Sequence, residues 1–538
     1  MGMANVTTAG VVRQTVEWAW MLGLATLAFA LLRNHTSIIT FPTPLDYYEG
    51  TVPLVTGLIA RGIDPYGLAQ QPVYAYVYPP LYNLIVAPLT LVFGNTFLVH
   101  RLVSAAFIAA CCALLGAAAR HAGARQRDAI GAALLLYGAL LYYSTPVAST
   151  NATGEFLFLA TVLLPWMRNF DRRSLALSVA CAVLAFYAKQ YFVLGAGIVA
   201  AWLFIAASKR RAITYATCAF GTLAVTLCAV HSASPYFLDD TLFSVRNLTA
   251  ALKSYSVLGK QLVFFAGVYP GLLLIGVVTG ATALRRICTE HPLVLHPQAT
   301  LRGVSLTRQP LSYIWFCFGC TTAAIVLVLG LNPGNFMTYL FQLMSPFLLL
   351  GVLAAPALRG RYRALILPLL LLTAARTWQV LPRDFNIDLS RWDRTRELVS
   401  SKERILASPI LVMTLLEQGR AIHQGGQTFY FRLAENKPAV FRQTNPAERP
   451  GAIWNAWLAG LYARIRAGEF ELLLLTPWDV QGIFEANPPP EGGDGVAELN
   501  RHYEITETFP ISMSERPGGG TFPMQVWRPR AGSQPEAH

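Results

Sequence analysis

Two carboxylates follow the first apolar run of the chain, in the segment Pro44-Leu-Asp46-Tyr-Tyr-Glu49-Gly50. Charge at the mouth of a membrane bundle is costly, so it is usually retained for function. A carboxylate in such a place can act as a general base on a hydroxyl group, or hold a metal ion together with a partner. We therefore expect Asp46 and Glu49 to be catalytic. The alternative is a solvated loop with ordinary surface acids.

A single lysine separates two adjoining apolar runs, in Phe186-Tyr-Ala-Lys189-Gln-Tyr191. A lipid phosphate or diphosphate needs fixed cations of this kind at a dry membrane mouth. Lys189 is thus a candidate substrate-binding residue, unless it is a snorkelling anchor. Arg246, in the loop 232–261, is a weaker candidate for the same role.

Aromatic and amide side chains supply further candidates. Tyr78 and Tyr82 belong to a tyrosine cluster at 74–82. Aromatic faces suit sugar rings, but aromatic residues are also enriched at every membrane interface, so both readings stand. Tyr339 and Gln342 lie one helical turn apart, where they can donate hydrogen bonds to a substrate or satisfy each other.

The composition requires a membrane bundle to position these residues. The chain has 538 residues, of which 54% are hydrophobic and 13% are charged, against about 25% charged in soluble proteins. Apolar windows of roughly 17–22 residues recur, long enough to cross a hydrocarbon core about 30 Å thick. We expect a polytopic α-helical membrane protein.

The short loops alternate between basic and cation-poor, which predicts their sides through the positive-inside rule. The loops near 120–127, 168–173, 209–211, 285–308 and 359–363 are basic. Placing them in the cytoplasm gives about eleven spanning helices, a cytoplasmic N-terminus and an extracytoplasmic C-terminus. The expected helices cover 16–33, 98–119, 128–147, 154–168, 174–188, 190–207, 212–231, 262–284, 311–330, 336–356 and 364–381.

The pattern divides the chain into a transmembrane part, residues 1–381, and an extracytoplasmic part, residues 382–538. The outer loop 33–99 contains an apolar stretch, 79–94, which is short and contains Pro80 and Pro88, so we expect it to be an interfacial or re-entrant segment. The C-terminal part has soluble composition. Its short strand and helix patterns predict a small α/β domain.

The net charge of +13 does not indicate a nucleic-acid partner. From residue 381 onward the chain has 17 Lys and Arg and 19 Asp and Glu. We therefore expect the excess of positive charge to lie in the cytoplasmic loops. The sequence has no nucleotide-binding phosphate loop and no His cluster with metal-ligand spacing. We assign no metal ligands and no definite cofactor, although a divalent cation is compatible with the paired carboxylates.

The order of several motifs resembles the bacterial GT-C glycosyltransferases, the superfamily of the protein O-mannosyltransferases and the lipid A aminoarabinose transferases. The resemblance covers roughly residues 16–381. It is carried by Asp46 with Glu49-Gly50, Ala60-Arg-Gly-Ile-Asp64-Pro-Tyr66, Tyr78-Pro-Pro-Leu-Tyr82, Phe93-Gly94, Arg101-Leu102, Lys189-Gln190 and Asn335-Phe-Met-Thr-Tyr339-Leu-Phe-Gln342. Several relatives have Lys-Pro-Pro where this chain has Tyr78-Pro79-Pro80, so another residue must supply that cation.

The resemblance implies a cell-membrane enzyme with a polyprenyl-phosphate-linked sugar donor and an extracytoplasmic lipid, glycan or protein acceptor. Asp46 would be the base, Glu49 its support, and Lys189 the contact to the lipid phosphate, with Gln190 beside it. Two rivals remain. One is a glycan polymerase or ligase with a lipid-diphosphate donor. The other is a secondary transporter, which would place ionisable residues near the bilayer midplane.

Overall fold

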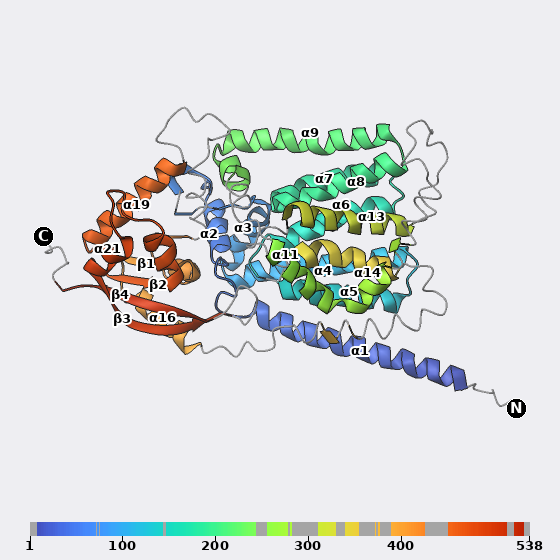
Figure 1. The fold of residues 1–538 in the computed structure, drawn as a ribbon, viewed down its shortest axis with the longest axis horizontal. Coiled ribbons are helices and arrows are strands. Elements are labelled where there is room, and N and C mark those ends of the chain that lie inside the picture. The colour runs from blue at the N-terminus through green and yellow to red at the C-terminus, as the bar shows by residue number, and fades with distance from the viewer. Residues whose placement is uncertain are drawn as a thin grey trace.

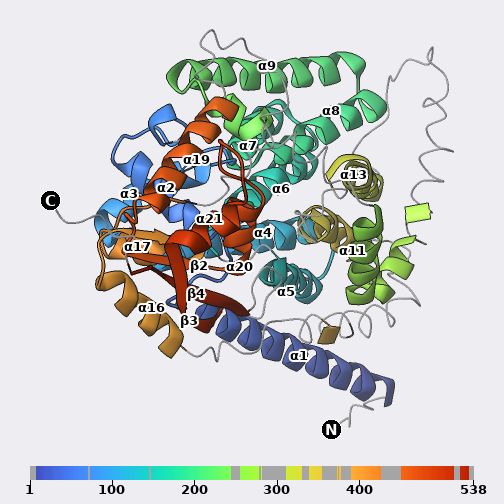
Figure 2. The same ribbon diagram turned by 60° about the vertical axis from the view of Figure 1, so that its left-hand side comes forward.

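The computed structural model describes residues 8–70, 73–74, 76–143, 147–243, 255–277, 280–281, 310–329, 339–353, 372, 375–376, 389–425, 450–513 and 521–531. A helical bundle forms one part and a region with a small sheet forms the other (Figure 1). Figure 2, in which the C-terminal region comes forward, shows that this region covers one end of the bundle. The short helices α2 and α3 lie between the two parts (Figure 1).

The bundle follows the expected helices closely. Each expected range up to 336–356 overlaps a described helix or a pair of consecutive helices, although 262–284 is shared with α11 only over residues 262–268. These are α1 (Thr8–Ile39), α4 (Phe97–His121), α5 (Gln126–Tyr143), α6 (Asn151–Met167), α7 (Arg172–Ala188), η2 with α8 (Gln190–Val193 and Leu194–Ala206), α9 (Lys209–Ala233), α11 (Tyr255–Val268), α13 with η6 (Pro310–Ala324 and Ile325–Leu329) and η8 with α14 (Leu340–Met344 and Ser345–Leu353). The last expected helix, 364–381, lies almost wholly outside the described residues.

Three described helices are both long and apolar enough to cross a membrane: Glu17–Ile39, Phe97–His121 and Lys209–Ala233. A fourth span results if Leu258–Val268 and Pro270–Val277, which meet at 96°, are counted together. The other bundle helices are shorter. Within the described part of the chain, the helices that are long and apolar enough to span a membrane are therefore fewer than the eleven expected.

Local sequence explains where the bundle helices begin and end. The Thr96 side chain caps α4 by accepting from the Val99 amide, and Asp171 caps α7 by accepting from the Ser174 amide at 2.6 Å. Arg120 and His121 close α4, where positive charge complements the helix dipole. These caps fix where the helices end. They therefore also fix where the connecting residues lie along the bundle axis.

The stretch expected to be interfacial is a short helix, α3 (Leu81–Phe93), of 13 residues. A helix of this length reaches only about 20 Å, less than a hydrocarbon core. Pro88 lies inside it, and Gly94 ends it with φ of +82°, a conformation that favours glycine. Together with α2 (Thr51–Ala60), it forms the layer between the bundle and the C-terminal region.

The C-terminal region contains one four-stranded sheet in the order β1-β2-β4-β3. Strands β1 (Ile405–Ala407) and β2 (Leu472–Leu475) are parallel, and β4 (Thr521–Pro529) pairs antiparallel with β2 and with β3 (Tyr503–Ser512). The accompanying helices are α16 (Ser390–Ser400), η10 (Pro409–Leu411), α17 (Val412–Glu417), α19 (Pro450–Arg466), α20 (Pro477–Asp479), η12 (Val480–Glu485) and α21 (Gly495–His502). The small α/β character expected from the sequence is confirmed, whereas the boundary at 381–382 lies outside the described residues.

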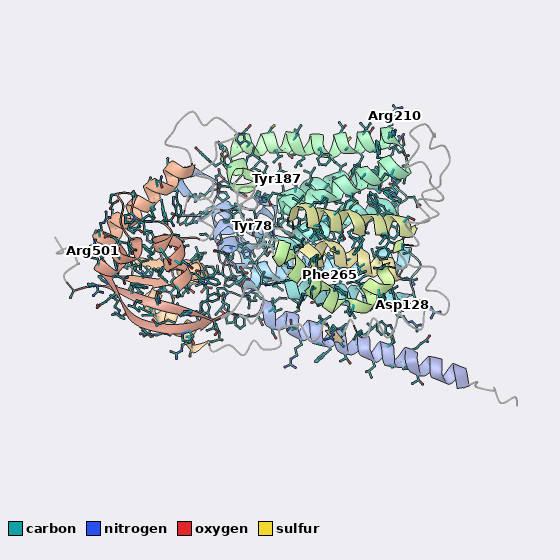
Figure 3. All side chains as sticks on the ribbon, in the orientation of Figure 1. Tyr78, Asp128, Tyr187, Arg210, Phe265 and Arg501 are labelled. Atoms are coloured by element: carbon teal, nitrogen blue, oxygen red, sulfur yellow. The ribbon has the colours of Figure 1, made fainter. Side chains whose placement is uncertain are left out.

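Tyr78 and the described basic loops near 120–127 and 209–211 lie at opposite ends of the bundle (Figure 3). Tyr78 lies where the bundle meets the C-terminal region, while Asp128 and Arg210 lie at the far end (Figure 3). Asp128 stands in the first turn of α5 and Arg210 in the first turn of α9, beside the basic loops. The charge pattern read from the sequence thus separates the two ends of the molecule.

Candidate active site

A buried ion pair fixes the segment 41–50 to the bundle. The side chains of Arg101, on α4, and Glu49 are fully buried. The arginine Nε and Nη2 donate to the two carboxylate oxygens at 2.9 Å and 2.8 Å. The remaining arginine donors bind the carbonyl oxygens of Ile38, Phe41 and Thr43. Arg101 therefore binds the backbone at the end of α1 and just after it, as well as the Glu49 side chain.

Glu49 is also bound by backbone amides on both sides. Its Oε2 accepts from the Leu45 amide at 2.7 Å, and its Oε1 accepts from the Ala148 amide, before α6, at 2.9 Å. Both oxygens are thus engaged with the protein itself. This arrangement favours a supporting role for Glu49 over a chemical one.

Loss of Arg101 should destabilise the protein. In Arg101→Leu the buried Glu49 carboxylate loses its charge partner, which typically costs about 3–5 kcal/mol. We expect a clearly lower unfolding temperature in detergent solution. Arg61→Leu is the matched control, because Arg61 is exposed in the same outer segment. If Arg101→Leu unfolded at the wild-type temperature, the Arg101–Glu49 ion pair would not be the interaction that holds the segment 41–50.

Asp46 lies half-buried in the turn that the Arg101–Glu49 ion pair holds. Its Oδ1 accepts from the Tyr48 amide at 3.0 Å, and its carbonyl accepts from the Glu49 amide at 3.1 Å. Burial raises the pKa of the Tyr48 hydroxyl, and the charges of Asp479, Asp46 and Tyr78 raise it further. Asp46 and Tyr78 therefore both lie within electrostatic reach of the Tyr48 hydroxyl.

Lys189 extends from the turn between α7 and η2 into a polar and aromatic cage. Its Nζ donates to the Asn151 Oδ1 at 2.8 Å. The same nitrogen lies 4.9 Å from the ring centre of Tyr78 and 5.4 Å from that of Tyr191. Burial lowers the pKa of Lys189 to about 8, because removal from water disfavours the charged amine.

Tyr78 connects the acid and the lysine. Its ring stands against Lys189, and it is among the groups, with Asp479 and Asp46, that raise the pKa of the Tyr48 hydroxyl. The ring also meets that of Tyr76 edge-on, with centres 5.6 Å apart. Lys189 thus lies against Tyr78, and Asp46 and Tyr78 both act on the neighbouring Tyr48.

Tyr339 and Gln342 join this cage through Tyr191. The Tyr191 hydroxyl donates to the Gln342 Oε1 at 2.7 Å, and the rings of Tyr191 and Tyr339 lie 4.7 Å apart. Both residues are buried on the helical segment that starts at Tyr339. The structure thus brings Lys189, Tyr339 and Gln342 together, although they are widely separated in the sequence.

Gln190 and Tyr82 make structural contacts instead. The Gln190 amide donates to the carbonyls of Val77 and Thr241, at 2.9 Å and 2.6 Å. The fully buried Tyr82 donates its hydroxyl to the His100 carbonyl at 2.8 Å. Both side chains therefore fix the backbone around the cage. Arg246 lies outside the described residues.

Three participants were not identified as site residues from the sequence. Arg101 was noted as a motif residue, but its partner Glu49 is 52 positions away. Asn151 and the fully buried Glu155 occupy the first turns of α6, four residues apart and hence on one face. Polar residues at this spacing on an apolar helix were the available signal. Among the described residues, no group of three or more His, Cys, Asp and Glu side chains is arranged to hold a metal ion.

The family model described as glycosyltransferase family 87 matches residues 76–306 of this chain. This range contains Tyr78, Arg101, Asn151 and Lys189. No curated protein matched the chain. The family match supports the expectation that the protein is a glycosyltransferase.

Solved structures of ArnT from Cupriavidus metallidurans are similar in overall arrangement. The complex with undecaprenyl phosphate is 12% identical, covers 96% of this chain and 99% of its own, and gives a TM-score of 0.48. The apo form is 13% identical, covers 97% and 100%, and gives the same TM-score of 0.48.

Proposed function

We propose that this glycosyltransferase transfers a sugar from a polyprenyl-phosphate donor to a hydroxyl group of an extracytoplasmic lipid, glycan or protein acceptor. The observation that carries the proposal is the caged Lys189 against the ring of Tyr78, with Tyr78 and the half-buried Asp46 both within electrostatic reach of the Tyr48 hydroxyl. A base and a phosphate-binding cation are the two groups that such a transfer requires.

The proposed reaction is a single displacement with inversion at the anomeric carbon. The acceptor hydroxyl gives its proton to the Asp46 carboxylate while its oxygen bonds to the anomeric carbon. The bond from that carbon to the phosphate oxygen breaks, and its electron pair stays on the phosphate. Lys189 stabilises the charge that develops there, and Asn151 and Tyr191 hold the amine in place.

Glu49 and Arg101 take the supporting role in this proposal, because each is fully engaged with the other. The charge pattern favours a reaction outside the cytoplasm. The described basic loops near 120–127 and 209–211 lie at the end of the bundle opposite to Tyr78 (Figure 3). The positive-inside rule therefore favours an outer position for Tyr78 and the C-terminal region and a cytoplasmic N-terminus.

An apolar cavity of about 540 Å³ supports a lipid-linked donor. Trp315, Phe316 and Gly319 of α13 line it together with Leu348 of α14. Because α14 continues directly from η8, Leu348 lies about two helical turns from Gln342. Val277, also in the lining, is largely exposed, as expected for a surface that faces lipid. We assign this cavity to the polyprenyl chain.

Filling the cavity should discriminate against long donors. A Cβ atom at Gly319 meets nothing within 4 Å, so Gly319→Leu is accommodated and adds bulk at the lining. We expect KM for a long-chain donor to rise about tenfold, the equivalent of about 1.4 kcal/mol, with KM for a short-chain donor unchanged. Gly221→Leu on α9, equally free of contacts, is the control. An equal effect on both donors would argue against the assignment.

The proposed function is tested directly with a panel of radiolabelled sugars linked to polyprenyl phosphate. Purified wild-type protein in lipid nanodiscs should hydrolyse or transfer at least one of them. Turnover of lipid-diphosphate donors alone would instead support the polymerase or ligase alternative, and turnover of neither class would refute the proposal.

A further inference from the structure

Tyr47, the residue next to Asp46, extends into the C-terminal region. It is buried in an apolar cluster that also contains Trp392, Val412 and Phe522. Its ring centre lies 5.8 Å from that of Phe522 and 6.0 Å from that of Trp478. A side chain of the first outer loop is therefore part of the core of a region that lies more than 340 residues later in the chain.

The Tyr47 hydroxyl is bound at the carboxyl ends of the two parallel strands. It donates to the Asp479 Oδ1 at 2.7 Å and lies 3.0 Å and 3.2 Å from the hydroxyls of Ser408 and Thr476. Ser408 directly follows β1, and Thr476 directly follows β2. The strand pair thus presents three polar groups to a single phenol.

Asp479 is itself fixed before it meets the tyrosine. Its Oδ2 accepts from the Thr476 amide at 2.8 Å and from the Thr476 hydroxyl at 2.7 Å. Burial raises the pKa of Asp479, while the hydrogen bond from Tyr47 opposes that rise. Losing the phenol would remove one of the hydrogen-bond donors of a buried carboxylate, which is costly.

Neighbouring residues of the same segment attach to both parts of the protein. The Thr51 hydroxyl donates to the Gly425 carbonyl at 2.6 Å, and a Cβ at Gly50 would lie 3.1 Å from the Cβ of Val412. Glu49 is bound to Arg101 on the bundle side. The turn that carries Asp46 is therefore fixed between the C-terminal region and α4.

We propose that Tyr47 is a positioning residue, through which the C-terminal region sets the orientation of the Asp46 carboxylate. Transfer then depends on both parts of the chain, even though the reacting groups come from the first. The proposal rests on the proposed function of Asp46 as the base. Displacement of a catalytic group by about 1 Å can lower a rate about 100-fold, so the anchor affects turnover more than binding.

The test is Tyr47→Phe, which keeps the ring and removes the hydroxyl. We expect kcat to fall by about 10- to 100-fold while KM for the lipid donor stays near the wild-type value. Hydrogen exchange of peptides covering 42–54 should rise. Tyr462→Phe is the matched control, because Tyr462 is also buried in the C-terminal region and donates its hydroxyl to the Asn487 carbonyl at 2.7 Å. It should lose comparable stability and retain kcat.

Wild-type kcat in Tyr47→Phe, or an equal fall in Tyr462→Phe, would overturn the proposal. If Tyr47→Phe does not fold, Asp479→Asn and Asp479→Ala replace it. The asparagine keeps an oxygen for the phenol and should retain most of kcat, whereas the alanine should lose it; equal activity of the two would overturn the proposal. If the wild type transfers no sugar, the proposed function fails, and the exchange of 42–54 still decides whether Tyr47 orders the Asp46 turn.

Discussion

Asp46→Asn should abolish sugar transfer while leaving the protein folded. The asparagine oxygen can still accept the Tyr48 amide bond, so the turn is retained. The amide cannot take a proton from the acceptor hydroxyl, and a general base typically contributes 10²–10⁴-fold to a rate. We expect kcat to fall by about 10³-fold at an unchanged unfolding temperature, measured with the donor identified by the radiolabelled panel.

The chain offers a close control for this variant. Asp64 lies in the same outer loop, and its Oδ1 accepts from the amide of Tyr66, two residues on, at 3.0 Å, in the same local geometry as Asp46. Asp64→Asn should therefore show the effect of removing such a charge without removing the base, and we expect near wild-type kcat. Turnover of Asp46→Asn within a few-fold of Asp64→Asn would remove Asp46 from the mechanism.

Features set by local sequence could be predicted well. Apolar runs indicated the positions of the described bundle helices, and the prolines of 79–94 indicated a segment too short to span a membrane, which is the 13-residue helix α3. Short strand patterns in the C-terminal part predicted strands there, and β3 and β4 are two of them. In each case the signal lies within one element, because periodicity reports which face of that element is buried.

Pairings between distant segments could not be predicted in this way. The sequence allowed Asp46 and Glu49 to act as a pair, but Glu49 is bound to Arg101, so the two carboxylates have different environments. Tyr47 gave no sign of its bond to Asp479, 432 positions away. Partner choice depends on how the elements pack, and a single sequence shows only which residues need a partner.

The caged lysine illustrates what the sequence did reveal. A lone cation between two apolar runs indicated a functional group, and its position in the cage with Tyr78 and Tyr191 is consistent with that prediction. The sequence could not show that burial lowers its pKa to about 8. That value places the titration of Lys189 in an accessible pH range, so its contribution can be measured.

Turnover at low donor concentration should decline as the pH rises through about 8. Below that pH the Lys189 amine is protonated and can bind the donor phosphate, and above it the amine of the free enzyme is neutral. Lys189→Arg should remove this decline, because the guanidinium stays charged. Lys189→Met should lower kcat/KM by about 100-fold, since one charge-stabilising donor is lost. It should also remove the decline, because the titrating amine is absent.

Lys209→Met provides the control for the charge and the aromatic contact. The Lys209 Nζ also lies over an aromatic ring, 5.6 Å from the centre of Phe204, but it starts α9, beside Arg210 at the end of the bundle far from Tyr78 (Figure 3). We expect Lys209→Met to keep the wild-type kcat/KM and its pH profile. If the decline near pH 8 persisted in Lys189→Arg, another group would be responsible for it. Lys189 would then not be the cation that binds the leaving phosphate.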